Sequence, residues 1–198
     1  SHLFKRAVSY IFIALFPVVI LIVTFAHESL TLWIGADFAD NSSLVLQLLA
    51  VGVLINSHAY VPFGLIQAAG RPDIIAKLHL AELPFYLLLL WWSLDVYGIA
   101  GAAIAWLLRV SFDAVLFSII ANRFLSTPSS FTFRSFIGVS LVFFSLALGA
   151  SISGLLMKGG FLLLVFFIFT PVAWFTILAS GERIMICNLL KVSSGFKN

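Results

Sequence analysis

Charged side chains are scarce in this sequence: its 198 residues include 11 Lys or Arg and 8 Asp or Glu, together 10% of the chain. A soluble domain carries about 25% charged residues. So few charges cannot cover the surface of a water-soluble fold, whereas 62% of the residues are hydrophobic and the mean hydropathy is +1.15. These values exclude a soluble enzyme, a nucleic-acid-binding protein and a disordered chain. They predict an integral membrane protein.

Cysteine and catalytic motifs are also nearly missing. Cys187 is the only cysteine, so an internal disulfide and a CxxC metal site are both excluded. The pair His27-Glu28 lacks the second histidine of the HExxH zinc-protease motif. The sequence therefore predicts no catalytic residue, no metal site, no cofactor and no enzymatic activity.

Long apolar runs stand in place of these features. Each run has about 20 residues, the length of a helix that crosses a hydrocarbon core of about 30 Å, and none alternates with the period of two of a barrel strand. The runs predict an all-α polytopic membrane protein with transmembrane helices at residues 7–26, 44–68, 74–94, 98–121, 136–157 and 160–179. The predicted loops are residues 37–43, 70–73, 95–98, 122–134 and 158–159.

The basic residues predict the orientation of these six helices, because Lys and Arg favour cytoplasmic loops. With the amino end inside, Lys158 alone falls on the outer side, and Arg109 falls within a helix. The other basic residues are all cytoplasmic: Lys5, Arg6, Arg71, Lys77, Arg123, Arg134, Arg183, Lys191 and Lys197. Both termini are then cytoplasmic, with a transmembrane part at residues 1–181 and a basic cytoplasmic tail at residues 182–198.

Three charged residues are expected at membrane depth: Glu82, Arg109 and Asp113. Each costs at least about 2.5–3.5 kcal/mol there, so such groups face protein or water. Arg109 and Asp113 are one turn apart, and antiparallel packing of the third and fourth helices brings Glu82 and His79 toward them. The cluster is either a structural ion pair that fastens two helices or the wall of a water-filled cavity. In the second case Arg109 meets an anionic group, and the carboxylates tune it or couple transport to an ion.

A second set of polar residues lies on the second predicted helix. Asn56, Tyr60 and Gln67 fall within about 40° of one another at 100° per residue, which indicates a wetted face. His58 is a further candidate, although a histidine hydrogen-bonded within the bundle is the alternative. Together with Arg109, these residues are the candidates for lining a substrate cavity.

Three motifs resemble one known family. They are Gln67-Ala-Ala-Gly-Arg-Pro-Asp73 followed by Lys77, then Tyr97-Gly-Ile-Ala-Gly-Ala-Ala-Ile-Ala105, and the earlier segment Leu32-Trp-Ile-Gly-Ala-Asp-Phe38. The chain resembles the carboxy-terminal half of polysaccharide (O-antigen type) flippases, in the superfamily of multidrug and oligosaccharidyl-lipid exporters. In that family a Q-A-x-G-[RK] turn ends one helix on the cytoplasmic side, and a Y-G-x-x-G-A-A element opens a later one.

The resemblance implies a MATE-like transporter of two six-helix lobes around a cavity, of which this chain is the carboxy-terminal lobe and therefore a fragment. Such flippases carry undecaprenyl-pyrophosphate-linked oligosaccharide across the bacterial inner (plasma) membrane for polysaccharide, including lipopolysaccharide, biosynthesis. The implied partners are the lipid-linked oligosaccharide, membrane lipid, the missing amino-terminal lobe and the polysaccharide polymerase machinery, with no nucleic acid.

The residue types suit that substrate, because a pyrophosphate is bound by Arg and sugars by amides and hydroxyls. Two alternatives stay open. One is a cation-coupled multidrug exporter of the same superfamily, with Glu82 or Asp113 as the proton or sodium site. The other is a membrane scaffold that transports nothing, in which the polar residues only join helices.

Overall fold

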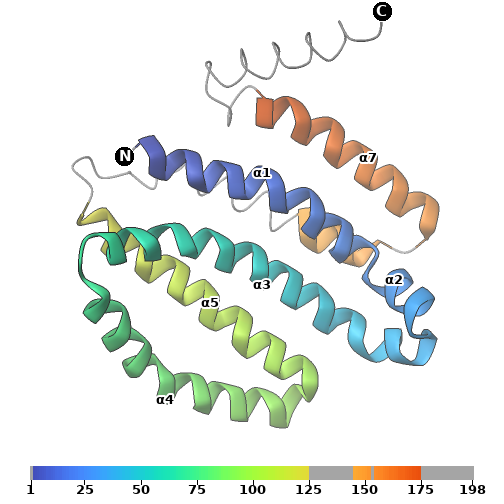
Figure 1. The fold of residues 1–198 in the computed structure, drawn as a ribbon. Helices are drawn as coiled ribbons and strands as arrows, with labels where there is room; N and C mark the ends of the chain where they lie inside the picture. The colour runs from blue at the N-terminus through green and yellow to red at the C-terminus, as the bar shows by residue number, and fades with distance from the viewer. Residues whose placement is uncertain (1, 125–144, 153, 175–198) are drawn as a thin grey trace, which may run out of the picture.

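The computed structural model describes residues 2–124, 145–152 and 154–174, and the side chains from residue 6 onward. This part of the chain is all-α (Figure 1). Its helices are α1 (His2–Thr24), α2 (Ala26–Trp33), α3 (Ala36–Ala68), α4 (Pro72–Tyr97), α5 (Ile99–Asn122), a short helical segment at residues 145–151, and α7 (Leu155–Val172). Five of them, namely α1, α3, α4, α5 and α7, are long and apolar enough to cross a membrane.

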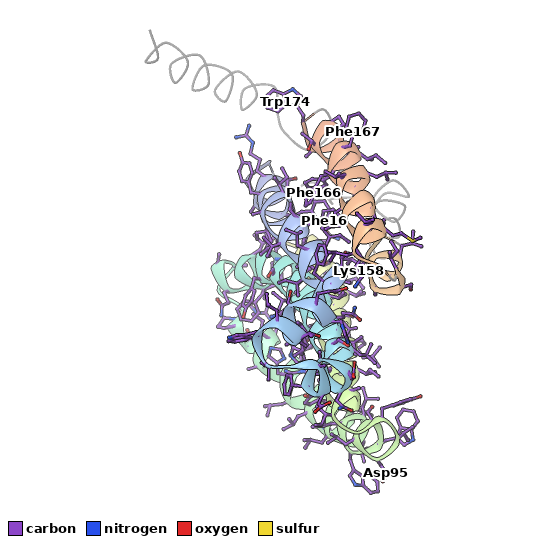
Figure 2. The ribbon with its side chains drawn as sticks, turned by 90° about the vertical axis from the view of Figure 1, so that its right-hand side faces the viewer. Phe16, Asp95, Lys158, Phe166, Phe167 and Trp174 are labelled. Atoms are coloured by element: carbon purple, nitrogen blue, oxygen red, sulfur yellow. The ribbon has the colours of Figure 1, made fainter. Side chains whose placement is uncertain are left out.

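The long helices lie in a row with α3 near its middle. α3 packs against α1 and α2 on one side and against α5 on the other; α4 packs mainly on α5, and α7 on α1 (Figure 1). One hydrophobic core joins α1, α3 and α7 around Phe16 and Ile20, and Phe166 of α7 packs against it (Figure 2). A second core, around Ile66 and Phe117, joins α3, α4 and α5.

Small residues allow the closest approaches between these helices, as is usual where apolar helices meet in a membrane. A Cβ added at Gly101 of α5 would collide with the backbone carbonyl of Ser93 in α4. A Cβ added at Gly52 of α3 would collide with the ring of Trp106 in α5. Gly98 makes the tight turn between α4 and α5 with a φ of +58°, a conformation that other residues rarely adopt. The α4–α5 pair is therefore held close at the end where Gly98 joins the two helices.

The prediction that residues 37–43 form a loop is wrong. These residues are the first turns of α3, which begins at Ala36, and Asn41 Nδ2 donates a hydrogen bond of 2.8 Å to the Asp37 carbonyl. Asp37 in the first turn is favourable because the helix amino end carries a partial positive charge. The low hydropathy of residues 37–43 reflects their exposure to solvent and does not mark the end of a helix.

The predicted boundary between the last two helices is also wrong. The sequence predicts a loop at residues 158–159, but both lie inside α7, which begins at Leu155. α7 is preceded instead by Gly154, which has a φ of +98°. Lys158 suggested a loop because it is charged, yet it is buried in an ion pair.

The remaining helix bounds agree with the predicted ones to within a few residues, apart from the amino end of α1. Residues 136–144 of the predicted fifth helix, residues 175–179 of the sixth and the tail at residues 182–198 lie outside the described residues. The predicted first helix, residues 7–26, is interrupted at Phe25, after which α2 begins at Ala26.

Candidate functional site

The three charged residues expected at membrane depth meet between α4 and α5. Arg109 Nε lies 3.7 Å from Glu82 Oε2. His79 Nδ1 lies 3.5 Å from the same Glu82 oxygen and 3.9 Å from Asp113 Oδ1. The approach of Glu82 to Arg109, expected from the antiparallel packing of consecutive helices, is confirmed. The direct Arg109–Asp113 pair is not what forms, because Arg109 turns toward Glu82 and Asp113 toward His79.

Helix geometry explains how these side chains converge. His79, Glu82 and Tyr86 are three and four residues apart on α4, so they share one face of the helix. Arg109 and Asp113 do the same on α5. The turn at Gly98 makes the two helices antiparallel neighbours and so places the two faces opposite each other. We refer to His79, Glu82, Arg109 and Asp113 as the charge cluster.

Aromatic rings border the charge cluster on two sides. The Arg109 guanidinium carbon lies 5.0 Å from the centroid of the Tyr86 ring, within the range of a cation–π contact. The His79 ring stands edge-on to Phe117 at 5.7 Å. Arg109 is therefore held by one carboxylate and one aromatic face.

The two carboxylates are buried, while the two basic groups are partly open. The side chains of Glu82 and Asp113 are 8% and 9% exposed, against 33% for Arg109 and 36% for His79. Both Glu82 carboxylate oxygens, Asp113 Oδ1 and His79 Nδ1 are buried without a hydrogen-bond partner among the described residues. Leaving such groups unpaired is costly in a protein interior. The cluster therefore has capacity to accept one more positively charged or donor group.

The polar residues of α3 divide between two faces. Gln47 Nε2 donates a 2.9 Å hydrogen bond to the Val23 carbonyl of α1. His58 Nδ1 donates one of 2.7 Å to the Leu54 carbonyl within α3, and its ring stands edge-on to Phe12 of α1 at 5.8 Å. His58 therefore lies between α1 and α3. A role for His58 in lining a substrate cavity stays a prediction.

Asn56, Tyr60 and Gln67 lie on another face of α3. Tyr60 is 62% exposed, Gln67 is exposed and Asn56 is half-buried. A row of edge-to-face rings runs from this face toward the charge cluster: Tyr60 to Phe63 at 6.2 Å, Phe63 to Phe117 at 5.6 Å, and Phe117 to His79 at 5.7 Å. Within the described residues no hydrogen bond or ion pair joins this face to Arg109, so the two sets are linked through aromatic packing.

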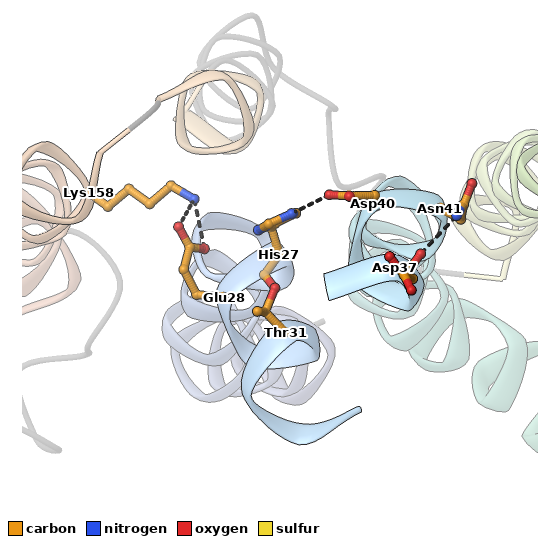
Figure 3. A network of polar contacts seen from close by, with 7 residues as sticks. All are labelled: His27, Glu28, Thr31, Asp37, Asp40, Asn41 and Lys158. Carbon is orange, nitrogen blue, oxygen red and sulfur yellow. Dashed lines mark hydrogen bonds and ion pairs between the residues drawn. The ribbon is translucent and has the colours of Figure 1, made fainter. Parts of the chain in front are cut away.

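A second polar network lies at the end of the bundle where α2 meets α3 and α7 (Figure 3). Lys158 Nζ of α7 donates hydrogen bonds of 2.7 and 2.8 Å to the two carboxylate oxygens of Glu28 in α2. His27 Nε2 pairs with Asp40 Oδ1 of α3 at 2.8 Å. The sequence places Lys158 on the outer side of the membrane, but it does not predict that Lys158 pairs with Glu28 or that His27 pairs with Asp40.

The pKa of Glu28 reflects this pairing. Partial burial raises the pKa, but the hydrogen bond from Lys158, a backbone hydrogen bond and the nearby positive charge together lower it by more. The net result is a pKa below the ordinary value of 4.5. Glu28 is therefore charged at neutral pH and ties α2 to α7.

Comparison with known proteins gives a partial match to a transporter. No protein-family model matches the chain, and no solved structure matches it. A protein of Shigella flexneri described as "Putative O-antigen transporter" is 38% identical over 127 residues, which cover 62% of this chain. The matched segment spans only 30% of the length of that relative. The resemblance seen in the sequence motifs is thereby confirmed: the chain is a multi-span membrane protein homologous, over this segment, to that transporter.

Proposed function

We propose that this chain is part of a flippase that moves undecaprenyl-pyrophosphate-linked oligosaccharide from the cytoplasmic to the outer leaflet of a bacterial inner membrane. Its helices are then the carboxy-terminal lobe of a MATE-like transporter and work with an amino-terminal lobe. The homology to an O-antigen transporter and the five candidate membrane spans support this assignment. The observation that carries the substrate class is Arg109, a partly open cation inside a membrane-spanning helix.

Arg109 suits a pyrophosphate because its planar guanidinium offers several donors to phosphate oxygens in one plane. Without substrate, the nearby Glu82 carboxylate and Tyr86 ring offset the cost of holding its charge away from water. An arriving pyrophosphate replaces Glu82 as the partner of Arg109, and Glu82 reclaims it afterwards. Such an exchange lets the anion bind and then leave, as transport requires.

The sugar units are assigned to the exposed face of α3. Asn56, Tyr60 and Gln67 offer amide and hydroxyl groups along about 16 Å of helix, at 1.5 Å per residue. Polar side chains that face lipid would gain nothing, whereas a glycan offers them hydrogen-bond partners. These residues and Arg109 then divide the substrate between them, with the charged linkage at α5 and the sugars at α3.

The proposed orientation has both termini in the cytoplasm. Arg71 and Lys77 near the α3–α4 turn and Arg123 at the end of α5 lie at one end of the bundle. Glu28, Asp40 and Lys158 lie at the other end. The excess of basic residues at the first end favours the cytoplasm there.

Export by Arg109 variants tests the proposal. Arg109→Ala and Arg109→Lys are introduced into the full-length protein in cells that lack their own copy, and surface polysaccharide is measured against the amount of protein in the membrane. We expect Arg109→Ala to abolish most export and Arg109→Lys to keep part of it. Arg123→Ala removes the same charge at an exposed helix end and is the matched control. Normal export by Arg109→Ala would remove Arg109 from the substrate path.

The buried carboxylates of Glu82 and Asp113 favour one second candidate, a cation-coupled multidrug exporter of the same superfamily. The two candidates differ in what the cell loses. Glu82→Gln and Asp113→Asn would raise drug sensitivity and leave surface polysaccharide intact in an exporter, and would do the reverse in a flippase. A scaffold would show neither loss, and a cysteine at Tyr60 would then resist water-soluble thiol reagents.

A further inference from the structure

We propose that His79, Glu82 and Asp113 form a binding site for one divalent metal ion between α4 and α5. One imidazole nitrogen and two carboxylate oxygens, all within 4.8 Å of one another, are available as ligands. The sequence predicts no metal at these residues, because Asp113 lies on a different helix from the other two and no ligand spacing connects them.

The ligand separations suit an ion. Divalent first-row metals bind imidazole nitrogen and carboxylate oxygen at about 2.0–2.2 Å, so two ligands of one ion are at most about 4.4 Å apart. His79 Nδ1 lies 3.5 Å from Glu82 Oε2 and 3.9 Å from Asp113 Oδ1. The three groups therefore need to move by only a few tenths of an ångström to surround an ion.

A second observation, independent of the spacing, is that these ligand atoms accept or donate no hydrogen bond among the described residues, although Glu82 lies 3.7 Å from Arg109. Glu82 and Asp113 are more than nine-tenths buried, at 8% and 9% exposure. Both Glu82 oxygens, Asp113 Oδ1 and His79 Nδ1 make no hydrogen bond to any described residue. Three neighbouring side chains thus leave buried acceptor atoms without a hydrogen bond in one small volume, where a metal ion would satisfy all of them.

The donor set and the charge indicate which ions fit. Imidazole favours Zn²⁺ and similar ions over Mg²⁺ or Ca²⁺, and carboxylates also accept Mn²⁺. Glu82 and Asp113 bring two negative charges, and Arg109 is the one fully charged cation near them in the described cluster. A divalent ion neutralises both carboxylates and takes Glu82 away from Arg109. On the proposed function, on which this last step rests, the released arginine is then free for a pyrophosphate.

The site is tested by titrating Zn²⁺, and separately Mn²⁺, into the full-length protein after treatment with a chelator, in detergent. Affinity is read by competition with a coloured zinc chelator, and metal-induced stabilisation by the rise in unfolding temperature. We expect one Zn²⁺ per protein, and at least tenfold weaker binding in His79→Gln, Glu82→Gln and Asp113→Asn. The matched control is His27→Gln with Asp40→Asn, which removes the exposed histidine–carboxylate pair at the other end of the bundle. It should bind Zn²⁺ like the wild type.

Three results would overturn the site. They are equal Zn²⁺ affinity in the wild type and Asp113→Asn, a loss that follows His27 instead of His79, and proton uptake by the cluster without any metal binding. The variants are close in size to the residues they replace, and their metal-free unfolding temperatures show whether they fold. If the protein binds no metal and export still depends on Arg109, the metal site is wrong and the proposed flippase function is supported. If the protein binds metal and Arg109→Ala exports normally, the metal site is supported and the role of Arg109 in the proposed function is wrong.

Discussion

Lys158 Nζ of α7 donates hydrogen bonds to both carboxylate oxygens of Glu28 in α2, at 2.7 and 2.8 Å, although 130 positions separate the two residues in the chain. The lysine side chain is buried at 9% exposure, whereas the Glu28 side chain is 36% exposed. The pair is therefore asymmetric, and the loss of each partner has a different consequence.

Glu28→Gln should destabilise the protein more than Lys158→Met. The first change leaves a buried ammonium group without its counter-ion, which costs about 1–3 kcal/mol. The second leaves a carboxylate that water can reach, and its cost should stay below about 1 kcal/mol, as for other exposed ion pairs. Unfolding in detergent, with Asp40→Asn as the control for an exposed pair, measures both. A larger loss in Lys158→Met would show that the lysine is not buried in the folded protein.

The Glu28–Lys158 pair should make stability fall in acid. Since the pKa of Glu28 is lower in the folded chain than its ordinary value of 4.5, the unfolded chain binds the proton more readily. The stabilisation is fully present above pH 4.5 and is lost as the pH falls below that value, through the folded pKa. The difference in unfolding temperature between the wild type and Glu28→Gln should then be constant from pH 7 to pH 5 and shrink in stronger acid. A difference that shrinks already near pH 6 contradicts this assignment.

Gly101→Ala should loosen the α4–α5 contact. The added methyl group meets the Ser93 carbonyl, which is backbone and cannot turn aside, so the helices must separate. We expect a loss of about 1–3 kcal/mol, typical of overpacking, together with reduced export because the charge cluster lies along the same interface. Gly64→Ala is the control, since a Cβ there meets nothing within 4 Å and alanine favours a helix by roughly 0.5–1 kcal/mol. Equal stability of the two variants would mean that the helices are not in close contact at Gly101.

Tyr86→Leu should weaken export, whereas Tyr86→Phe should not. The ring face holds Arg109 at 5.0 Å, and such a contact contributes about 0.5–2 kcal/mol, more when it is shielded from water. Phenylalanine keeps that face, so its export should stay within about twofold of the wild type, and leucine should cost up to about tenfold. Surface polysaccharide per unit of membrane protein measures both. An equal loss of export in Tyr86→Leu and Tyr86→Phe would mean that the Tyr86 hydroxyl, and not the ring face, is what export requires.

The sequence predicted the helices well and their neighbours only in part. The lengths of the apolar runs predicted the five described spans. The predicted turn ending at Gly98 made α4 and α5 antiparallel neighbours, and this predicted that Glu82 lies close to Arg109. Hydropathy carries no information on which non-consecutive helices touch. The packing of α3 on α5 and of α7 on α1 could not be predicted for that reason.

The errors at Asp37 and Lys158 have a common cause. Hydropathy treats a charged residue as a mark of solvent, yet Asp37 stabilises a helix end and Lys158 is buried against a counter-ion. The unused ligand atoms of His79, Glu82 and Asp113 were invisible for a similar reason. A sequence shows that these groups are polar, but only the folded structure shows that they lack hydrogen bonds within the described residues.

The length of α3 has a mechanical consequence. Its 33 residues form a helix about 50 Å long, whereas its neighbour α5, with 24 residues, reaches about 36 Å, and the hydrocarbon core is about 30 Å thick. α5 is only slightly longer than the hydrocarbon core is thick, so a steep tilt would draw its ends into lipid. α3 has surplus length and can lean much further while its polar ends remain in water. On the proposed transport function, the bundle opens to one side of the membrane and then to the other. α3 is then the helix best suited to tilt, and α5 the one best suited to stay fixed.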